Sequence, residues 1–154
     1  MNNVKPVVIA IACDHAGLKL KEFLIDYLRR GSYQVVDLGT NTLDSVDYPD
    51  YANVLADAIL NNSADTGILV CGSGIGVSIA ANRHNGIRAA LVNEINSARL
   101  CRLHNDANVI AFGARVIEPK IAIECLEMFL STEFEGGRHI KRLNKLDNKK
   151  STYN

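Results

Sequence analysis

The sequence lacks a long apolar run, an excess of either charge and any closely spaced pair of cysteines. Seventeen lysines and arginines balance seventeen aspartates and glutamates, which argues against a broad electrostatic surface for nucleic acid or a membrane. No apolar run comes close to a length of about 20 residues, which a helix needs to span a bilayer. The first residues do not contain the apolar core of a signal peptide. Four widely spaced cysteines without a C-x-x-C pair indicate neither a disulfide framework nor a zinc site. We therefore expect a cytoplasmic protein that binds no nucleic acid and no membrane.

The 154 residues contain no internal repeat and are long enough for one domain with a buried core. Short apolar runs alternate with amphipathic segments, which predicts parallel strands joined by right-handed helical crossovers. The expected strands are 7–13, 34–38, 66–71, 88–92 and 108–112. The expected helices are 18–30, one that follows a polar loop through 48–50 and ends near residue 62, 76–84, 94–104 and 119–130. We predict a single α/β domain over residues 1–154: three layers, a five-stranded parallel Rossmann-like sheet, and a C-terminal helical tail that is loosely ordered from about Asn144.

The first predicted helix has a clear apolar face, and its residues are expected to pack on the sheet. They are Leu20, Phe23, Leu24, Tyr27 and Leu28.

Polar and reactive residues follow three of the predicted strands. The first strand leads into Cys13–Gly17, the third into Cys71–Gly76 and the fifth into Gly113–Arg115. In open α/β sheets, ligands bind outside the carboxyl ends of the strands. The sequence therefore brings Asp, His, Cys, Arg and a glycine-rich loop to one edge of the sheet, and this set of residues predicts a catalytic site.

The glycine-rich loop has the spacing G-x-G-x-G, which differs from the G-x-G-x-x-G of dinucleotide-binding folds. Glycines let successive backbone N–H groups point at one spot, and the following helix adds its positive end. Such a nest binds an anion. The anion is either a phosphate or an oxyanion that exists only during a reaction.

Cys71 stands immediately before this loop. A nest and a helix N-terminus favour the thiolate form of a neighbouring cysteine, which can then act as a base or a nucleophile. An oxyanion held beside a base suits proton abstraction next to a carbonyl, through an enediolate. The alternative is that Cys71 is only a small buried residue at a strand end, as free cysteines often are.

Five motifs occur in order along nearly the whole chain, from Val7 to about Arg142. They are CDHAG at 13–17, DYPDYA at 47–52, CGSGIGVSIAANR at 71–83, RLHNDANVIAFGAR at 102–115 and EGGRHIKR at 135–142. Together they resemble the ribose-5-phosphate isomerase B family, which also includes the galactose-6-phosphate isomerase subunits. The resemblance implies an aldose–ketose isomerase that acts on a sugar phosphate through an enediolate, without a metal or an organic cofactor, in the non-oxidative pentose phosphate pathway.

The resemblance also implies roles for individual residues. Cys71 matches the base that moves a proton between C1 and C2, and His104 matches the acid/base that opens the furanose ring. The backbone N–H groups of the loop match the enediolate hole, formed by Gly72, Ser73, Gly74, Ile75 and Gly76. The remaining matches contact the substrate's hydroxyls or its phosphate end: Asp14, His15, Asn105, Arg115, Arg138 and Arg142. A second subgroup of the family uses a glutamate as its base, at the position that Val77 occupies here, so the chain resembles the cysteine type.

Several of these residues also have a structural interpretation. Asp14 could cap the helix that begins near Gly17, His15 could be a solvated loop residue, and His104 could complement a helix dipole. Arg138 and Arg142 are four residues apart and could form surface ion pairs. Cys13, Cys101, Cys125, His84 and His139 are interpreted as structural.

Two other functions stay open at this point. A hexose 6-phosphate isomerase of the galactose or allose type has the same chemistry, and a non-catalytic sugar-phosphate-binding protein would use the same nest.

Ten residues of helix advance about 15 Å, so the helix after the fourth strand should carry His104 to the sheet edge opposite Cys71. Together with the resemblance, this predicts a homodimer, or a tetramer built from it, in which Cys71 and Arg142 of one site come from different chains.

Overall fold

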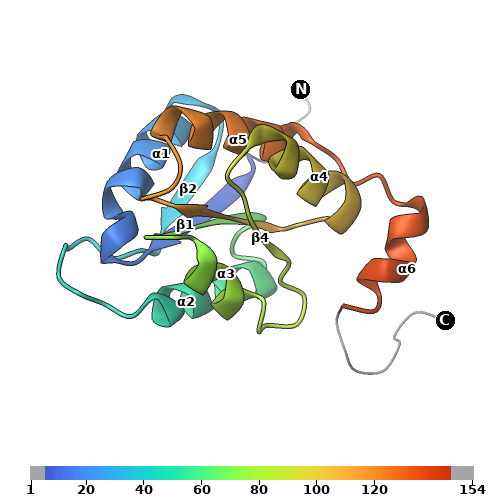
Figure 1. Cartoon of the computed structure of the whole chain (residues 1–154), viewed down its shortest axis with the longest axis horizontal. Coiled ribbons are helices and arrows are strands. Elements are labelled where there is room, and N and C mark those ends of the chain that lie inside the picture. The colour runs from blue at the N-terminus through green and yellow to red at the C-terminus, as the bar shows by residue number, and fades with distance from the viewer. Residues whose placement is uncertain (1–5, 147–154) are drawn as a thin grey trace.

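A five-stranded parallel sheet forms the centre of the protein, as the alternation of apolar and amphipathic segments predicted (Figure 1). The structure, a computed structural model, describes residues 6–146. The strands are β1 (Val8–Cys13), β2 (Gln34–Asp37), β3 (Thr66–Cys71), β4 (Ala89–Leu91) and β5 (Val109–Gly113). Their order is β2-β1-β3-β5-β4. Every residue of β1 and β5 is buried, which explains why these strands read as continuous apolar runs.

Helices cover both faces of the sheet, which confirms the three-layer prediction (Figure 1). One face carries α1 (Leu18–Arg30), α4 (Ile95–Asn105) and α5 (Pro119–Ser131). The other carries α2 (Tyr48–Leu60) and α3 (Ile75–Ala81). Helix α2 already includes residues 48–50, which were predicted to be loop, because a proline suits the first turn of a helix. A short 3₁₀ turn (His15–Gly17) precedes α1, and a second (Gly137–His139) precedes α6 (Ile140–Leu143). These last two form the helical tail, which projects from the sheet in Figure 1.

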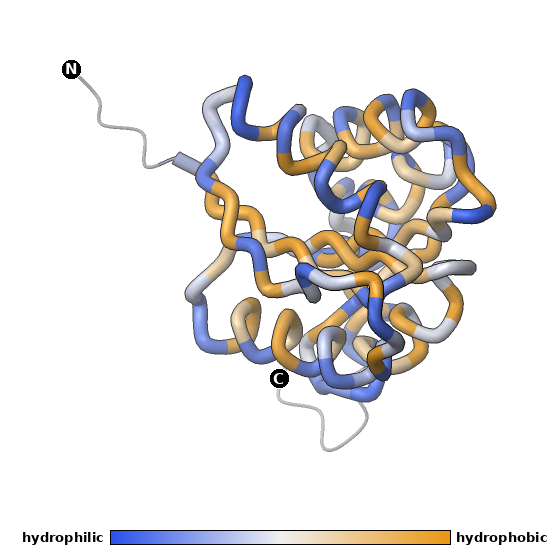
Figure 2. The backbone as a smooth tube through the Cα atoms, turned by 90° about the vertical axis from the view of Figure 1, so that its left-hand side faces the viewer, coloured by the Kyte–Doolittle hydropathy of each residue, from blue (hydrophilic) through white to orange (hydrophobic). Residues whose placement is uncertain are grey.

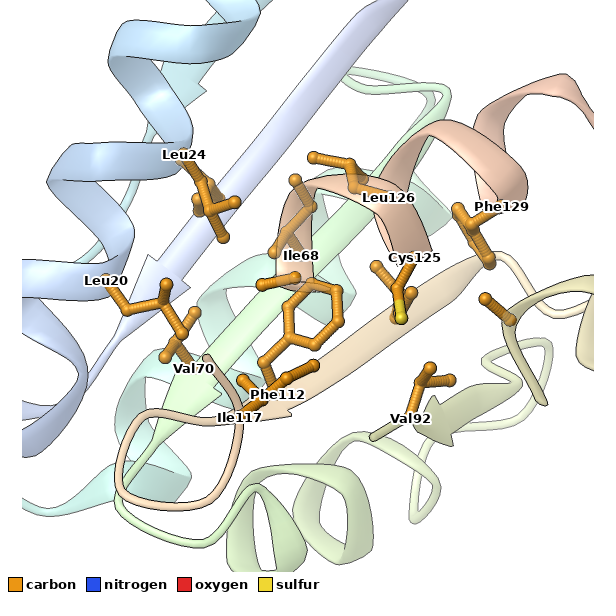
Figure 3. Close-up of a cluster of buried hydrophobic side chains, with 14 of the residues drawn as sticks. Leu20, Leu24, Ile68, Val70, Val92, Phe112, Ile117, Cys125, Leu126 and Phe129 are labelled. Atoms are coloured by element: carbon orange, nitrogen blue, oxygen red, sulfur yellow. The ribbon is translucent and has the colours of Figure 1, made fainter. Parts of the chain in front are cut away.

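The core has two parts, one on each face of the sheet. On the α1/α5 face, Phe112 of β5 lies among Ile68, Val70 and Leu126 (Figure 3). Figure 2 shows the same organisation from the side, with hydrophobic residues along the strands between the two helical layers. Burying a side chain such as Phe112 contributes about 1.5–3 kcal/mol relative to leaving it exposed. Successive residues of a strand face opposite sides of the sheet. Cys13 pairs with Val70, and Cys71 is one residue further along β3. Cys13 therefore packs on one face of the sheet and Cys71 on the other.

Helix α1 differs from the prediction at two positions: one residue predicted on its buried face is exposed, and one buried residue was not predicted. Phe23 is 44% exposed, whereas Lys21 is fully buried. The Lys21 ammonium donates to Asp37 at 2.8 Å and to the Thr40 carbonyl at 2.9 Å, so its charge is paired and hydrogen-bonded. Lys21 is buried and Asp37 is partly exposed, and the contacts of the ammonium attach the loop after β2 to α1.

Helix α3 is shorter than predicted and ends at Ala81. The Asn82 side chain pairs with Ala89 of β4, accepting from its N–H and donating to its C=O, both at 2.8 Å. This pairing competes with further helical hydrogen bonds and turns the chain. Within residues 6–146, no helix has the length and apolar character needed to cross a membrane. The tail was predicted to be loosely ordered from about Asn144, but Asn144 is the C-cap of α6. The rest of this predicted tail, beyond residue 146, lies outside the described residues.

Candidate active site

A cavity of about 400 Å³ lies at the carboxyl edge of the sheet, where the sequence predicted the site. It brings together residues from three strand ends and from the start of α2. The lining residues are Asp14, His15, Ala16, Tyr48, Cys71, Gly72, Ser73, Gly76, Arg115 and Val116. A cysteine, a histidine, a carboxylate and a guanidinium thus share one cavity, which is large enough for a small polar metabolite.

The glycine loop reaches this cavity through a left-handed residue, Gly74, with φ of +77°. A Cβ on Gly74 would lie 2.5 Å from Leu91, 2.8 Å from the carbonyl carbon of Phe112 and 2.9 Å from the nitrogen of Gly113. Two of these neighbours are backbone atoms, which cannot move aside. Glycine is therefore required here both for its conformation and for its size.

Cys71 is buried at the base of the loop. Its sulfur accepts a hydrogen bond of 3.1 Å from the backbone N–H of Gly74. The N–H of Ile75 donates to the Ser73 hydroxyl at 3.2 Å. The other backbone N–H groups of the loop, those of Gly72, Ser73 and Gly76, have no acceptor among the described residues. Three N–H groups of the loop are therefore free to donate to an oxyanion beside Cys71, and two are engaged in internal hydrogen bonds.

Asp14 and His15 follow β1 and both make local hydrogen bonds. One Asp14 oxygen, Oδ1, accepts from the N–H groups of Ala16 and Gly17 at 3.0 and 3.1 Å. Asp14 is thus the N-cap of the 3₁₀ turn, as the structural interpretation proposed, and it also lines the cavity. His15 accepts from the Val46 N–H through Nδ1 at 3.2 Å. This bond fixes its neutral tautomer with the proton on Nε2.

Arg115 reaches across from the loop after β5. A Cβ on Gly72 would lie 3.0 Å from Arg115 Nη1, so the guanidinium lies directly over the start of the glycine loop. The N–H of Arg115 also donates to the Gly72 carbonyl at 3.0 Å. The forked donors of this arginine suit a phosphate or carboxylate at this end of the cavity.

Three residues that line the cavity were not predicted as site residues: Ala16, Tyr48 and Val116. The Tyr48 ring packs on Gly76, where a Cβ would lie 2.7–3.0 Å from the ring atoms. Its position in the DYPDYA motif was the available signal. The contact with Gly76 joins α2 to α3 across 28 residues, and no local pattern reports such a distance. Val77, the position of the glutamate in the other subgroup, is fully buried.

The other predicted site residues lie elsewhere. His104 and Asn105 are the last residues of α4, which runs back along the sheet and ends next to the first residues of β5. Cys71 is the last residue of β3 and pairs with Gly113 at the end of β5. A six-residue strand spans about 20 Å, so one chain holds Cys71 and His104 at opposite edges of its sheet. That placement is as predicted.

The tail residues join this second group. The chain turns at Gly136 and Gly137, with φ of +70° and +57°. Arg142 Nη1 then lies 3.5 Å from His139 Nδ1, and the ring of His139 stacks on that of His104. Asn105 faces a separate cavity of about 360 Å³. The structure thus divides the predicted residues into two half-sites, which we name by their contents: the Cys71 half-site and the His104 half-site.

Within residues 6–146, one group of side chains has the composition of a metal site. It comprises His104, Glu135 and His139, whose ligand atoms lie within 4.8 Å of one another. The two imidazole planes are stacked at an angle of 16°. Ring-nitrogen lone pairs lie in the ring plane, so two stacked rings cannot direct them at one ion unless one ring rotates. As arranged, these residues do not fit a metal.

The other three cysteines, Cys13, Cys101 and Cys125, lie in the core and have raised pKa values. Burial raises the pKa of Cys13 to about 12 and the pKa values of Cys101 and Cys125 to about 11. These groups therefore stay protonated at neutral pH. Their packing in the α1/α5 part of the core agrees with the structural role expected for them.

Comparison with known proteins identifies the family. The sequence pattern of the Ribose/Galactose Isomerase family matches residues 9–146. The chain belongs to this family. It is 44% identical to Ribose-5-phosphate isomerase B of Escherichia coli over 88% of this chain and 91% of that protein. The crystal structure of a ribose 5-phosphate isomerase from Thermotoga maritima has a TM-score of 0.91 at 50% identity, covering 93% of this chain and 99% of the other.

A further family member was solved with a ligand. The structure of Ribose-5-phosphate Isomerase B from Mycoplasma genitalium, with bound ribulose-5-phosphate, has a TM-score of 0.87 and 44% identity. It covers 91% of this chain and 93% of that one. These comparisons confirm the resemblance that the five sequence motifs carried, together with the Rossmann-like fold.

Proposed function

We propose that this protein interconverts D-ribose 5-phosphate and D-ribulose 5-phosphate through an enediolate, with Cys71 as the base. The observation that carries the proposal is the cysteine sulfur at the base of the 400 Å³ cavity, hydrogen-bonded to the glycine-loop N–H at 3.1 Å. Family members named ribose-5-phosphate isomerase, one of them solved with ribulose-5-phosphate, support the choice of substrate.

Two groups of the protein act on C1 and C2 of the substrate: the Cys71 thiolate and the N–H groups of the glycine loop. The Cys71 thiolate removes the proton from C2 of the open-chain aldose, and the C–H electrons form the C1=C2 bond of an enediolate. Negative charge collects on O1, where the N–H groups of Gly72, Ser73 and Gly76 are available to donate. The proton of O2 then passes to O1, and the thiol returns its proton to C1 as the C2 carbonyl forms, which gives the ketose.

The far end of the substrate needs positive charge for its phosphate. Arg115 and His15 lie in the same cavity as Cys71, and guanidinium groups bind phosphate through paired N–H donors. We assign Arg138 and Arg142 to the same phosphate and Asp14 and Asn105 to the sugar hydroxyls. One oxygen of Asp14 serves as the N-cap, and among the described residues Oδ2 has no donor, so it can accept from a substrate hydroxyl.

A second copy of the chain would complete the site. His104, Asn105, Arg138 and Arg142 cannot reach Cys71 of their own chain, since they lie at the opposite edge of the sheet. Exposed apolar residues border the glycine loop on the β4 side and suit burial between subunits. They are Ile75, Ile79, Leu91, Ile95 and Val116. We therefore propose a homodimer in which the Cys71 half-site of one chain faces the His104 half-site of the other.

The cysteines and the type of reaction bear on the compartment and on the need for a cofactor. All four cysteines are free thiols, as expected in a reducing compartment, and we place the protein in the cytoplasm. The proposed reaction requires no redox step and no Lewis acid, because a base, an acid and an oxyanion hole supply each proton and charge. We therefore assign no cofactor.

Replacing Cys71 with alanine tests the assignment of the base. The expected result is a fall in kcat of at least roughly a hundredfold, the usual scale of a positioned acid–base group, with ribulose 5-phosphate still bound. Cys101→Ala, which removes a thiol from the core of the opposite face, is the matched control and should keep its turnover. Unchanged turnover in Cys71→Ala would remove this residue from the mechanism, and a wild-type protein that binds without turnover would indicate a sugar-phosphate-binding protein instead.

A further inference from the structure

The tail of the chain contains a buried histidine with an unsatisfied nitrogen. His139 is 4% exposed, and its Nε2 has no hydrogen-bond partner among the described residues. Its ring is stacked on that of His104, with centroids 4.5 Å apart and planes at 16°. A buried polar atom without a partner costs free energy, so a functional reason for this arrangement is needed.

Glu135 lies beside both imidazoles. Its Oε2 is 3.2 Å from His139 Nε2 and 4.0 Å from His104 Nε2. The backbone N–H of Glu135 donates to the Leu103 carbonyl at 3.1 Å, which attaches this segment to the end of α4. The distance to His139 is short enough for a hydrogen bond, but the present orientation of the two groups does not form one. The Glu135 side chain is 57% exposed and therefore has room to reorient toward either ring.

Arg142 determines where the proton of His139 lies. Its Nη1 is 3.5 Å from His139 Nδ1, and a guanidinium can only donate. Nδ1 is therefore the acceptor, and the proton of the neutral ring is on Nε2, on the side of Glu135. The contacts form a continuous chain from Arg142 through His139 and Glu135 to His104.

We propose that Glu135 and His139 are positioning residues for His104 in the opening of the furanose ring. The inference rests on the proposed function, which gives His104 its substrate. Neither residue needs to touch the sugar. The stacked His139 ring restricts rotation of the His104 imidazole, and the Glu135 carboxylate faces its Nε2 edge and favours a proton there.

Ring opening is the step for which this orientation matters. The C1–O4 bond breaks, its electrons go to O4, and O4 takes a proton from His104. The O1 hydroxyl gives its proton to a water molecule as the C1 carbonyl forms. His104 is 37% exposed and would otherwise sample several rotamers. An acid misplaced by about 1 Å costs about a hundredfold in rate.

The reverse substrate separates ring opening from proton transfer. In ribulose 5-phosphate the C5 oxygen is esterified, so no hydroxyl can close a five-membered ring on the C2 carbonyl. This ketose is acyclic, and exchange of its C1 proton with D₂O needs only Cys71 and the enediolate hole. NMR of this exchange therefore measures the enediolate step without His104.

The test compares Glu135→Gln and His139→Asn with the wild type. We expect kcat for ribose 5-phosphate to fall about tenfold to a hundredfold with KM unchanged, while C1 exchange in ribulose 5-phosphate stays within about twofold of the wild-type rate. Glu133→Gln is the matched control, because Glu133 is an exposed glutamate of the same segment with no side-chain hydrogen bond or ion pair among the described residues. It should retain both rates.

Four results distinguish the inference from its alternatives. Equal loss of turnover and exchange would mean that the residues only hold the structure, and unchanged turnover would mean that they hold nothing relevant; both overturn the inference. A raised KM with unchanged kcat would also overturn it, since the effect would then pass through the phosphate arginines. A wild-type protein without either activity would instead remove the proposed function. Glu135→Gln alters a half-exposed side chain, so folding does not confound this variant.

Discussion

The backbone N–H of Gly74 donates a hydrogen bond of 3.1 Å to the sulfur of Cys71. The donor and the acceptor are three residues apart, and the left-handed conformation of Gly74 brings them together. An N–H directed at the sulfur stabilises negative charge there. In the proposed mechanism, the same loop therefore stabilises the base and supplies N–H groups for the oxyanion that the base generates.

Alkylation should distinguish Cys71 from the other three cysteines. Iodoacetamide at pH 8 is expected to modify Cys71 first and to abolish activity, since this thiol lines the substrate cavity. Burial raises the pKa of Cys13 to about 12 and those of Cys101 and Cys125 to about 11, so these groups remain protonated and unreactive. Peptide mapping by mass spectrometry identifies the modified residue, and ribose 5-phosphate should protect it. Full inactivation with Cys71 still unmodified would contradict the assignment.

Substitution of Gly74 should damage the loop more than a change of conformation alone explains. In Gly74→Ala, the new Cβ would lie 2.8–2.9 Å from backbone atoms of Phe112 and Gly113. We expect a loss of at least about 2 kcal/mol in the free energy of unfolding and loss of turnover. Gly137→Ala is the control, because Gly137 also has positive φ but no atom lies within 4 Å of its Cβ position. It should cost about 1 kcal/mol; equal losses in urea denaturation would show that the close contacts of Gly74 do not matter.

Mixing two inactive variants tests whether active sites are shared between chains. Cys71→Ala and Arg142→Ala are prepared separately, shown to be nearly inactive, and allowed to exchange subunits. A mixed dimer then has one doubly altered site and one intact site, so random exchange should restore about a quarter of wild-type activity. Cys71→Ala mixed with Cys71→Ser controls for exchange itself and should restore none. If exchange is demonstrated and activity stays absent, each site belongs to a single chain.

The sequence was a good guide wherever a local pattern determines the structure. Runs of apolar residues located all five strands, and the order of elements placed Cys71, Asp14 and Arg115 at one edge because parallel strands share their carboxyl ends. Contacts between distant side chains were not predictable in this way. The pairing of Lys21 with Asp37 makes a lysine part of the core. The stacking of His104 on His139 joins two helices 35 residues apart, and only the folded chain reveals it.

The most direct test of the central claim is kcat/KM for isomerisation of ribose 5-phosphate, measured beside allose 6-phosphate and galactose 6-phosphate. The hexose phosphates place one more carbon between the reacting centre and the phosphate, so a cavity of fixed size that is lined by both Cys71 and Arg115 should discriminate by length. Ribose 5-phosphate should have the highest kcat/KM, by at least about tenfold, the scale of one methylene group in a fitted pocket. A large preference for either hexose phosphate would contradict this claim.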